Sequence, residues 1–288
     1  MSETADKDVE RGEKMAAAAA EAVNTVDPQL LAMLRQPKSY CIYGQAKTRK
    51  SGQIAQAFQK GLFLLSSPNV LLGFASWVVK NPASGLRLPK NVVINEFKKG
   101  SADQERINNW DSVHTAVRAY MTRCDREPGT YDALIIDEMS TFAKRWVSDL
   151  SNLDLYPEMA SAKTGKLDIF RVYQVINDYV RYLCQGVVQA SQTNVVMVCH
   201  EVGPKYDADT GALKGMGGPD FPTGNAQKDA THDADATLRF FLKEALDGVE
   251  YWIRTAPHPE WRGGGRFSGV DPEVKQTFTE LLQTVQFG

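Results

Sequence analysis

The sequence predicts a three-layer α/β fold, in which a mostly parallel sheet is covered by helices on both faces. Short apolar segments typical of buried strands alternate with helical segments along most of the chain. Parallel strands need such helical connections between them. Near the C-terminus two strand-like segments follow each other directly. We therefore expect a mostly parallel central sheet with a C-terminal antiparallel hairpin.

Three strands are predicted in the first half of the chain, at residues 40–43, 62–67 and 91–97. The second is a continuous apolar run bounded by a proline, as expected for a strand buried on both faces. The third is rich in β-branched residues, which favour strands. Residues 69–80 fit a helix or a strand equally well, and residues 27–35 favour a short amphipathic helix.

Three helices accompany these strands. Residues 50–61 end at a glycine suited to a helix C-terminus, residues 101–124 begin at a serine cap, and residues 166–188 show the clearest helical spacing. The residues expected to face the core are Ile54, Ala57 and Phe58 in the first helix, Ile107, Trp110, Val113, Val117, Tyr120 and Met121 in the second, and Ile169, Tyr173, Ile176, Val180, Leu183 and Val187 in the third.

The second half of the chain adds strands at residues 131–138 and 193–200 and a hairpin around the Asp247-Gly248 turn. A final helix is predicted over residues 271–287. Residues 202–230 are rich in Gly, Pro, Asp and Lys and too long for an ordinary connection. They are either a functional loop or a mobile insert.

Composition excludes several classes of protein. The net charge of −2 argues against a general coating of nucleic acid, although a local basic patch is compatible with it. The 4 cysteines include no C-x-x-C pair, so we expect buried thiols in a reducing compartment rather than disulfides or a zinc site. No segment reaches the ~18 apolar residues of a membrane span.

The N-terminus is acidic and polar before a run of alanines, which does not fit a secretory signal. We expect a cytoplasmic protein. Residues 1–27 are predicted to be a disordered or loosely helical tail, or alternatively a partner-docking helix. Because the α/β pattern is continuous after the tail, residues 28–288 are expected to form one domain.

The segment GQAKTRKS, residues 44–51, nearly matches the phosphate-binding pattern G-x-x-x-x-G-K-[ST]. It follows a predicted strand and precedes a predicted helix, where backbone N–H groups and the helix N-terminus converge on an anion. Arg49 stands where the second glycine is expected. The expected nucleotide-binding residues are Gly44, Gln45, Ala46, Lys47, Thr48, Arg49, Lys50 and Ser51.

Polar residues end two of the later predicted strands. Asp137 and Glu138 follow the apolar run ALII, where nucleotide hydrolases carry a carboxylate for Mg²⁺ and a second one for the attacking water. His200 ends the strand NVVMVC and is placed to sense the γ-phosphate or the catalytic water. A structural histidine, an exposed pair of acids and a basic turn remain the alternatives for each segment taken alone.

Taken in order, the segments GxxKTxKS, YDALIIDEMSTF, NVVMVCHE and EYWIRTAPHPEWRGGGRFSGV resemble the phage-encoded RecA-like ATPases of the AAA-type P-loop set, which include the single-strand-annealing recombinase ATPases. The resemblance covers about residues 38–270 and departs from the family at Arg49. It implies a three-layer RecA-like P-loop fold, ATP and Mg²⁺ as cofactors, action on single-stranded DNA and assembly into rings or filaments, in the host cytoplasm if the chain is phage-encoded.

The resemblance also implies roles for individual residues. Lys50 would contact the β- and γ-phosphates, Ser51 and Asp137 would hold Mg²⁺, Glu138 would be the catalytic base and His200 the sensor. A second candidate for the base is Glu96, and Arg262 or Arg266 could reach the site of a neighbouring subunit as an arginine finger.

Two alternatives remain. If Arg49 needs a positive φ or fills the site, the chain would be a pseudo-ATPase that serves as a nucleic-acid-binding or assembly module. A small-molecule kinase would use the same loop, but residues 202–230 carry lysines and lack the arginines typical of a kinase lid.

Overall fold

The computed structural model describes residues 36–66, 91–94, 110–246, 248–265, 270–275 and 277–287. The predictions made for residues 1–27, 27–35 and 69–80, and for Glu96, Ile107, Asp247 and Arg266, lie outside the described residues.

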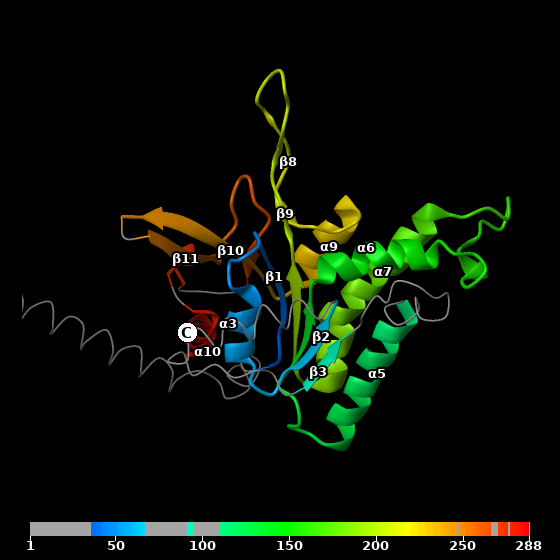
Figure 1. Ribbon diagram of the computed structural model, residues 1–288, viewed down its shortest axis with the longest axis horizontal. Coiled ribbons are helices and arrows are strands. Elements are labelled where there is room, and N and C mark those ends of the chain that lie inside the picture. Colours follow the sequence, from blue (N-terminus) through cyan, green and yellow to red (C-terminus); the bar gives the residue numbers. More distant parts are fainter. Residues whose placement is uncertain are drawn as a thin grey trace, which may run out of the picture. The chain divides into compact units, whose positions relative to one another are not determined.

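The strands of the described residues form a large mixed sheet (Figure 1). Its order is β13-β11-β10-β1-β5-β4-β2-β3, with β12 beside β10. From β10 to β3 all neighbours are parallel, whereas β10–β11, β11–β13 and β10–β12 are antiparallel. The predicted α/β class, with a mostly parallel sheet and a C-terminal hairpin, is confirmed. The strand bounds are β1 Ser39–Gly44, β2 Leu62–Leu65, β3 Asn91–Ile94, β4 Ala133–Asp137, β5 Asn194–Cys199, β10 Ala236–Ala245, β11 Gly248–Arg254, β12 Gly264–Gly265 and β13 Glu273–Val274.

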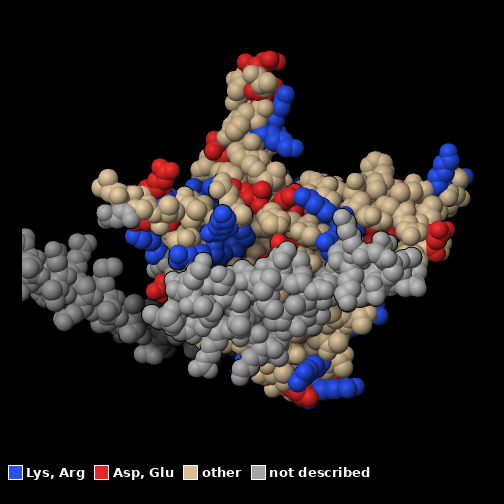
Figure 2. All heavy atoms as spheres, viewed as in Figure 1, with Lys and Arg blue, Asp and Glu red and all other residues tan. Residues whose placement is uncertain are grey.

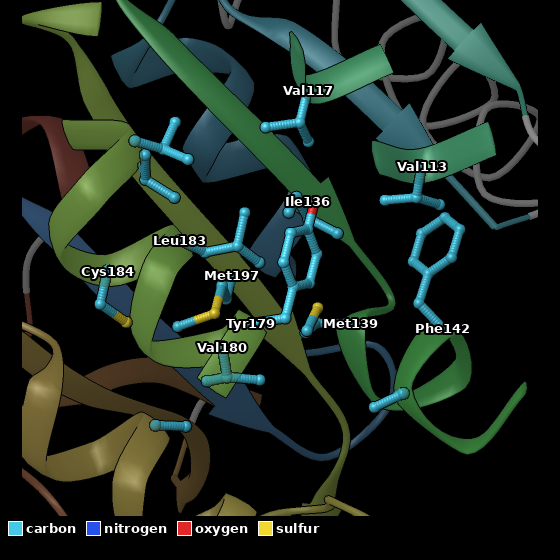
Figure 3. Close-up of a cluster of buried hydrophobic side chains, with 14 of the residues drawn as sticks. Val113, Val117, Ile136, Met139, Phe142, Tyr179, Val180, Leu183, Cys184 and Met197 are labelled. Carbon is cyan, nitrogen blue, oxygen red and sulfur yellow. The ribbon is translucent and has the colours of Figure 1, made fainter. Parts of the chain in front are cut away.

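Helices cover both faces of the sheet, because alternate strand residues point to opposite sides. On one face Tyr43, Ile136 and Met197 pack against α5 (Trp110–Arg126), α6 (Met139–Leu150) and α7 (Ile169–Tyr182), as Figure 3 shows in part. On the other face Ile42 and Ile135 pack with α3 (Lys50–Ala57) and α10 (Phe278–Phe287). The three layers that the alternating pattern predicted are present.

Side-chain caps set the first residues of α7 and α10. Asp168 accepts hydrogen bonds from the N–H groups of Phe170 and Arg171, so α7 starts at Ile169. The helix predicted over residues 271–287 begins only at Phe278, because Thr277 and Glu280 form a reciprocal capping box. Before it, the chain forms β13.

The inward faces of the helices differ in detail from the prediction. In α7 Val172 is buried and Tyr173 only partly so, and the helix passes through a π-turn at Leu183–Val187 into α8 (Val188–Ser191). In α5 Cys124 is buried, whereas Met121 lies at the edge of the core. In α3 Ala55 is buried, with Ala57 partly buried. The helix α6 was not predicted at all.

Residues 202–230 contain regular secondary structure, and their role as a functional loop or a mobile insert stays a prediction. Two short antiparallel pairs and a helix capped by Thr223 account for them. Asp207 stabilises the turn of the outer pair by accepting hydrogen bonds from the N–H groups of Asp209 and Thr210. The elements are β6 Glu201–Val202, β7 Lys205–Tyr206, β8 Leu213–Gly215, β9 Gly218–Pro219 and α9 Gly224–Asp233, with a 3₁₀ turn at Pro157–Met159 earlier in the chain.

All four cysteines are free and buried, as predicted. Among the described helices, none combines the length and apolar character needed to cross a bilayer.

Candidate nucleotide-binding site

The predicted site residues meet at one edge of the sheet. The parallel strands β1, β5, β4 and β2 lie side by side, so their carboxyl ends point to the same edge. The loop begins at Gly44, the last residue of β1, and His200 follows β5. Asp137 ends β4 with Glu138 directly after it, and Ser66 follows β2. Because β5 lies between β1 and β4, His200 stands between the loop and the acids. The sequence could not show that β5 lies between β1 and β4 in the sheet, since β5 comes after β4 in the chain.

The backbone of residues 44–51 requires glycine at its first position. A Cβ atom at Gly44 would lie 2.0 Å from the carbonyl oxygen of Phe240 on β10, so any side chain would force the two strands apart. Further along, Lys47 and Arg49 are left-handed, with φ of 67° and 61°. Left-handed residues between right-handed ones are typical of backbone nests, in which successive N–H groups converge on an anion.

Arg49 adopts the conformation for which phosphate loops use glycine. Its φ of 61° and ψ of 23° place it in the left-handed region, directly before α3. A non-glycine residue is strained there by roughly 1–2 kcal/mol. The side chain does not fill the loop, however, because the guanidinium lies over the ring of Tyr251 on β11, 3.9 Å from its centroid. An arginine at this position therefore strains the backbone of the loop but leaves the space for a ligand unfilled.

Lys50 begins α3 and points back across the loop. Its ammonium donates hydrogen bonds to the carbonyl oxygens of Gly44 and Gln45, each at 2.8 Å, and approaches the Thr48 hydroxyl at 3.4 Å. Burial lowers the pKa of Lys50, while the nearby Asp137 carboxylate opposes that shift. The amine therefore lies in the concave side of the loop, at the N-terminus of α3, where a phosphate group would be bound.

Asp137 is the most deeply buried carboxyl of the site, with 3% of its surface exposed. Burial raises its pKa, and the hydroxyl of the neighbouring Ser51 lowers it in part. One oxygen, Oδ1, accepts a hydrogen bond from the N–H of Glu138 at 3.0 Å, whereas Oδ2 is buried with no hydrogen-bond partner in the described part of the chain. A hydroxyl beside a buried carboxyl oxygen without a partner fits a Mg²⁺ ion, which prefers such oxygen ligands.

Glu138 is the second left-handed residue at the start of a helix, with φ of 62° directly before α6. The Ser66 hydroxyl donates a hydrogen bond to its Oε2, and its Oε1 lies 3.9 Å from Nε2 of His200. Burial raises the pKa of Glu138, which the charges of Arg145 and Lys50 oppose. The carboxylate is thus directed between the ends of β2 and β5, beside Asp137.

His200 is held by its backbone while its side chain remains half exposed. Its N–H donates to the Ser140 hydroxyl at 3.0 Å, and its carbonyl accepts from the N–H of Asp220 at 2.9 Å. Burial and the charge of Lys50 lower the pKa of His200, so the ring is neutral near pH 7. A neutral imidazole can donate or accept a hydrogen bond here, as a sensor of bound phosphate must.

Sequence reasoning missed three residues of this site. Ser66 contacts Glu138, Ser140 positions His200, and Arg145 lies close enough to Glu138 to affect its pKa. Ser66 could have been found, because it ends a predicted strand of the parallel sheet. Ser140 and Arg145 belong to α6, and without that helix nothing in the sequence directs them to the site.

The C-terminal candidates make contacts within the chain. Nε of Arg262 donates to Oε1 of Gln227 at 3.2 Å. The neighbouring Trp261 is covered by the guanidinium of Arg239, 3.4 Å from the ring centroid, and Arg239 forms a two-point ion pair with Glu201 at 2.7 and 3.2 Å. Through Arg239, these contacts link the segment around Arg262 to Glu201, the residue that follows His200. That Arg262 acts as an arginine finger in a neighbouring subunit stays a prediction. Glu96 and Arg266 lie outside the described residues.

Electrostatics favour an anion at the loop. Lys47 and Arg49 are exposed, and Lys50 is partly exposed. Figure 2 shows basic side chains over the start of α3 and along the neighbouring hairpin, with acidic side chains between them. A glycine-dependent backbone, a partly buried lysine at the helix N-terminus and a serine beside a buried carboxylate together define a P-loop nucleotide-binding domain.

Comparison with known proteins identifies the family. A family model described as an AAA domain matches residues 36–267, and the chain belongs to this family. Among solved structures, the chain is similar to a KaiC-like protein from the hyperthermophilic archaeon Pyrococcus horikoshii OT3, with 11% identity and a TM-score of 0.38 over 80% of this chain and 83% of that one. The comparison with curated proteins found no match.

Proposed function

We propose that the chain binds ATP with Mg²⁺ and hydrolyses it, and that it uses this cycle on single-stranded DNA in phage recombination or replication. The observation that supports the nucleotide site most directly is the position of Lys50, whose ammonium lies 2.8 Å from two carbonyl oxygens of its own loop at the N-terminus of α3. Membership in the AAA domain family supports the same function. The setting in phage recombination is supported by the motif resemblance alone.

In the proposed site each residue has a separate task. Lys50 would exchange its carbonyl contacts for phosphate oxygens, and the loop N–H groups would surround the same anion. Ser51 and Asp137 would hold Mg²⁺, which supplies charge neutralisation to the phosphates when bound. The buried Oδ2 of Asp137 would gain the partner that it lacks among the described residues.

Glu138 is the residue best positioned to accept a proton from the attacking water. Its carboxylate is partly buried and lies beside His200, with Ser66 orienting one of its oxygens. Its raised pKa makes it a stronger base than an ordinary glutamate. The neutral His200 ring would hydrogen-bond to the γ-phosphate or the same water.

The central test compares ATP binding by the wild type and Lys50→Ala, measured by calorimetry with Mg²⁺. We expect binding in the wild type and a loss of at least about tenfold in the variant, because a charge-assisted hydrogen bond contributes about 1.5–3 kcal/mol. Equally weak binding by both proteins would refute the nucleotide site.

The pseudo-ATPase alternative makes a different prediction. If the strain at Arg49 silences the site, ATP would bind without turnover, and Arg49→Gly would restore hydrolysis. Phosphate release by the wild type, measured with and without single-stranded DNA, separates the two functions. Clear turnover that DNA stimulates would exclude the pseudo-enzyme, and binding without turnover would support it.

The ribbon β7–β8 supports action on single-stranded DNA. Tyr206 and Leu213 are 48% and 40% exposed, and Lys205 and Lys214 flank them on the same ribbon. Exposed aromatic and basic residues in alternation suit base stacking and backbone contacts. Tyr206→Ala should weaken binding of a labelled oligothymidine about fivefold or more. An unchanged affinity would remove this surface from the proposal.

Assembly into a ring or filament is also part of the proposal. Phe170 at the start of α7 is 81% exposed, so its ring is accessible to a neighbouring subunit. Sedimentation with ATP, Mg²⁺ and single-stranded DNA would measure the assembly. Phe170→Ser should reduce the size of the assembly, and a strictly monomeric wild type would contradict this part.

A further inference from the structure

The β10–β11 hairpin extends past the phosphate loop. β10 pairs with β1 from Tyr40–Ala236 up to Gly44–Phe240, where β1 ends and the loop begins. β10 then continues to Ala245 and pairs only with β11 in the described residues. The hairpin therefore lies beside residues 45–50, on the opposite side of β1 from β5 (Figure 1).

One face of the hairpin carries the apolar residues Leu242, Val249 and Tyr251, with Glu244 opposite Val249 near its end. Phe240 and Ile253 point into the core shared with α3 and α10, so by strand alternation Leu242 and Tyr251 continue the same face beyond the core. Leu242 and Tyr251 are directly opposite each other, and Leu242 is 38% exposed. Val249, on the same face, is 55% exposed.

The opposite face of the hairpin is closed by its own contacts. The ammonium of Lys243 lies 3.7 Å from the centroid of Trp252 and 2.6 Å from the Glu273 carboxylate. The indole N–H of Trp252 donates to Glu250 at 3.0 Å. The Trp252 ring therefore lies under Lys243, whose ammonium is also held by the Glu273 carboxylate.

Arg49 connects the face that carries Leu242 and Tyr251 to the phosphate loop. Its guanidinium lies 3.9 Å from the centroid of Tyr251, and the next residue in the chain is Lys50. The Tyr251 ring is thus one side-chain length from the position proposed for the phosphates. A planar cation stacked on this ring shows that a flat group fits there.

We propose that Tyr251 and Leu242 form the base-binding surface of the nucleotide site, and that a purine base takes the place of the Arg49 guanidinium on the Tyr251 ring. This inference rests on the proposed function, because the loop must bind the triphosphate of the same molecule. Displaced from Tyr251, the Arg49 side chain turns toward the phosphates. Arg49 is then a positioning residue that exchanges one partner for another as the nucleotide binds.

The test compares two ligands that share phosphates and differ in the base. Calorimetry with Mg²⁺ gives the Kd of ATP and of inorganic tripolyphosphate for each variant. We expect Tyr251→Ala to weaken ATP binding about tenfold, because the base loses its stacking partner, and to leave tripolyphosphate binding within about twofold. Tyr251→Phe keeps the ring and should bind both ligands like the wild type.

Three control variants separate the possible causes of weaker ATP binding in Tyr251→Ala. Tyr182→Ala removes a tyrosine that is 41% exposed and lies on α7, which packs on the opposite face of the sheet from α3. This variant should change neither Kd. Lys50→Ala should weaken both ligands, and if it changes neither, the proposed function fails rather than the base surface. Tyr251→Ala in an Arg49→Gly background should still lose ATP selectively, because the base contacts the ring directly.

Two results would overturn the inference. If Tyr251→Ala weakens ATP and tripolyphosphate equally, the ring acts only by holding Arg49 and the loop. If it weakens neither, the base binds elsewhere. Weaker binding of ATP alone in Tyr251→Ala, with wild-type binding in Tyr251→Phe, would support the proposed base-binding surface.

Discussion

Two strand-to-helix turns of this protein begin their helices in the same unusual way. β1 leads to α3 through residues 45–49, and β4 leads to α6 directly at Glu138. The residue before each helix is a charged, non-glycine residue in the left-handed conformation, Arg49 with φ of 61° and Glu138 with φ of 62°. Both turns therefore carry the same backbone strain at the same edge of the sheet.

The two turns differ in where the strained side chain lies. Glu138 points between Ser66 and His200 at the ends of neighbouring strands, whereas Arg49 points outward onto Tyr251. At the short turn, strain directs a carboxylate toward the proposed reaction. At the longer turn, the loop itself would bind the ligand through its backbone, and the strained side chain is left to contact the hairpin. The same backbone geometry thus serves two different purposes.

The largest expected difference between the turns is in catalysis. Glu138→Gln should reduce ATP turnover by about 100-fold or more, because it removes the proposed base without changing its shape. Arg49→Ala should reduce turnover by less than about tenfold, since Arg49 is proposed to position the nucleotide and not to transfer a proton. Steady-state phosphate release measures both. Equal losses in the two variants would show that Arg49 takes part in the reaction.

The pH dependence of turnover sharpens the role of Glu138. Burial raises its pKa above the usual 4.5, so the carboxylate takes up a proton at a higher pH than an ordinary glutamate. Turnover should therefore fall about tenfold per pH unit below this raised pKa. A kcat profile from pH 4 to 8 at saturating ATP measures this limb. A profile that stays flat down to the ordinary glutamate range would exclude Glu138 as the base.

Backbone strain can be measured by placing glycine or alanine at each turn. Arg49→Gly should be more stable than Arg49→Ala by roughly 1–2 kcal/mol, because only glycine adopts a positive φ without penalty. The pair Glu138→Gly and Glu138→Ala should differ in the same direction and by a similar amount. Urea unfolding gives each difference. If alanine equals glycine at either turn, that residue is not left-handed in solution.

The smallest effect concerns Asp137, which precedes the short turn. Burial raises its pKa from 3.8 in the folded protein, so the wild-type free energy of unfolding decreases as pH rises through the interval between the two values. Above the raised pKa the folded protein carries a buried charge, which lowers its stability. Asp137→Asn should remove this cost and stabilise the protein by about 1 kcal/mol.

Urea unfolding at pH 7 measures the effect of Asp137→Asn, and Mg²⁺-dependent ATP binding should be lost in the same variant. A lower stability of the asparagine variant would mean that the carboxylate is better solvated or paired than its burial indicates.

The candidate site could be predicted from sequence to the extent that its residues end strands. Gly44, Asp137 and His200 each follow an apolar run, and the carboxyl ends of parallel strands share an edge. The contacts of Ser140 and Arg145 depend on α6, whose Ser- and Thr-containing start gave no clear helical signal. Glu96 lies outside the described residues, so its role stays a prediction.

The sequence by itself determined the main strands of the parallel sheet and the helices α3, α5 and α7, because strand and helix periods and capping residues are local properties of the chain. It also determined that a basic loop and two acids end parallel strands. Only the tertiary structure decided the order of those strands, the left-handed φ of Arg49 and the contact of its guanidinium with Tyr251. These depend on residues distant in the chain. The Phe240 carbonyl excludes a side chain at Gly44, and the hairpin that follows it provides the ring on which Arg49 lies.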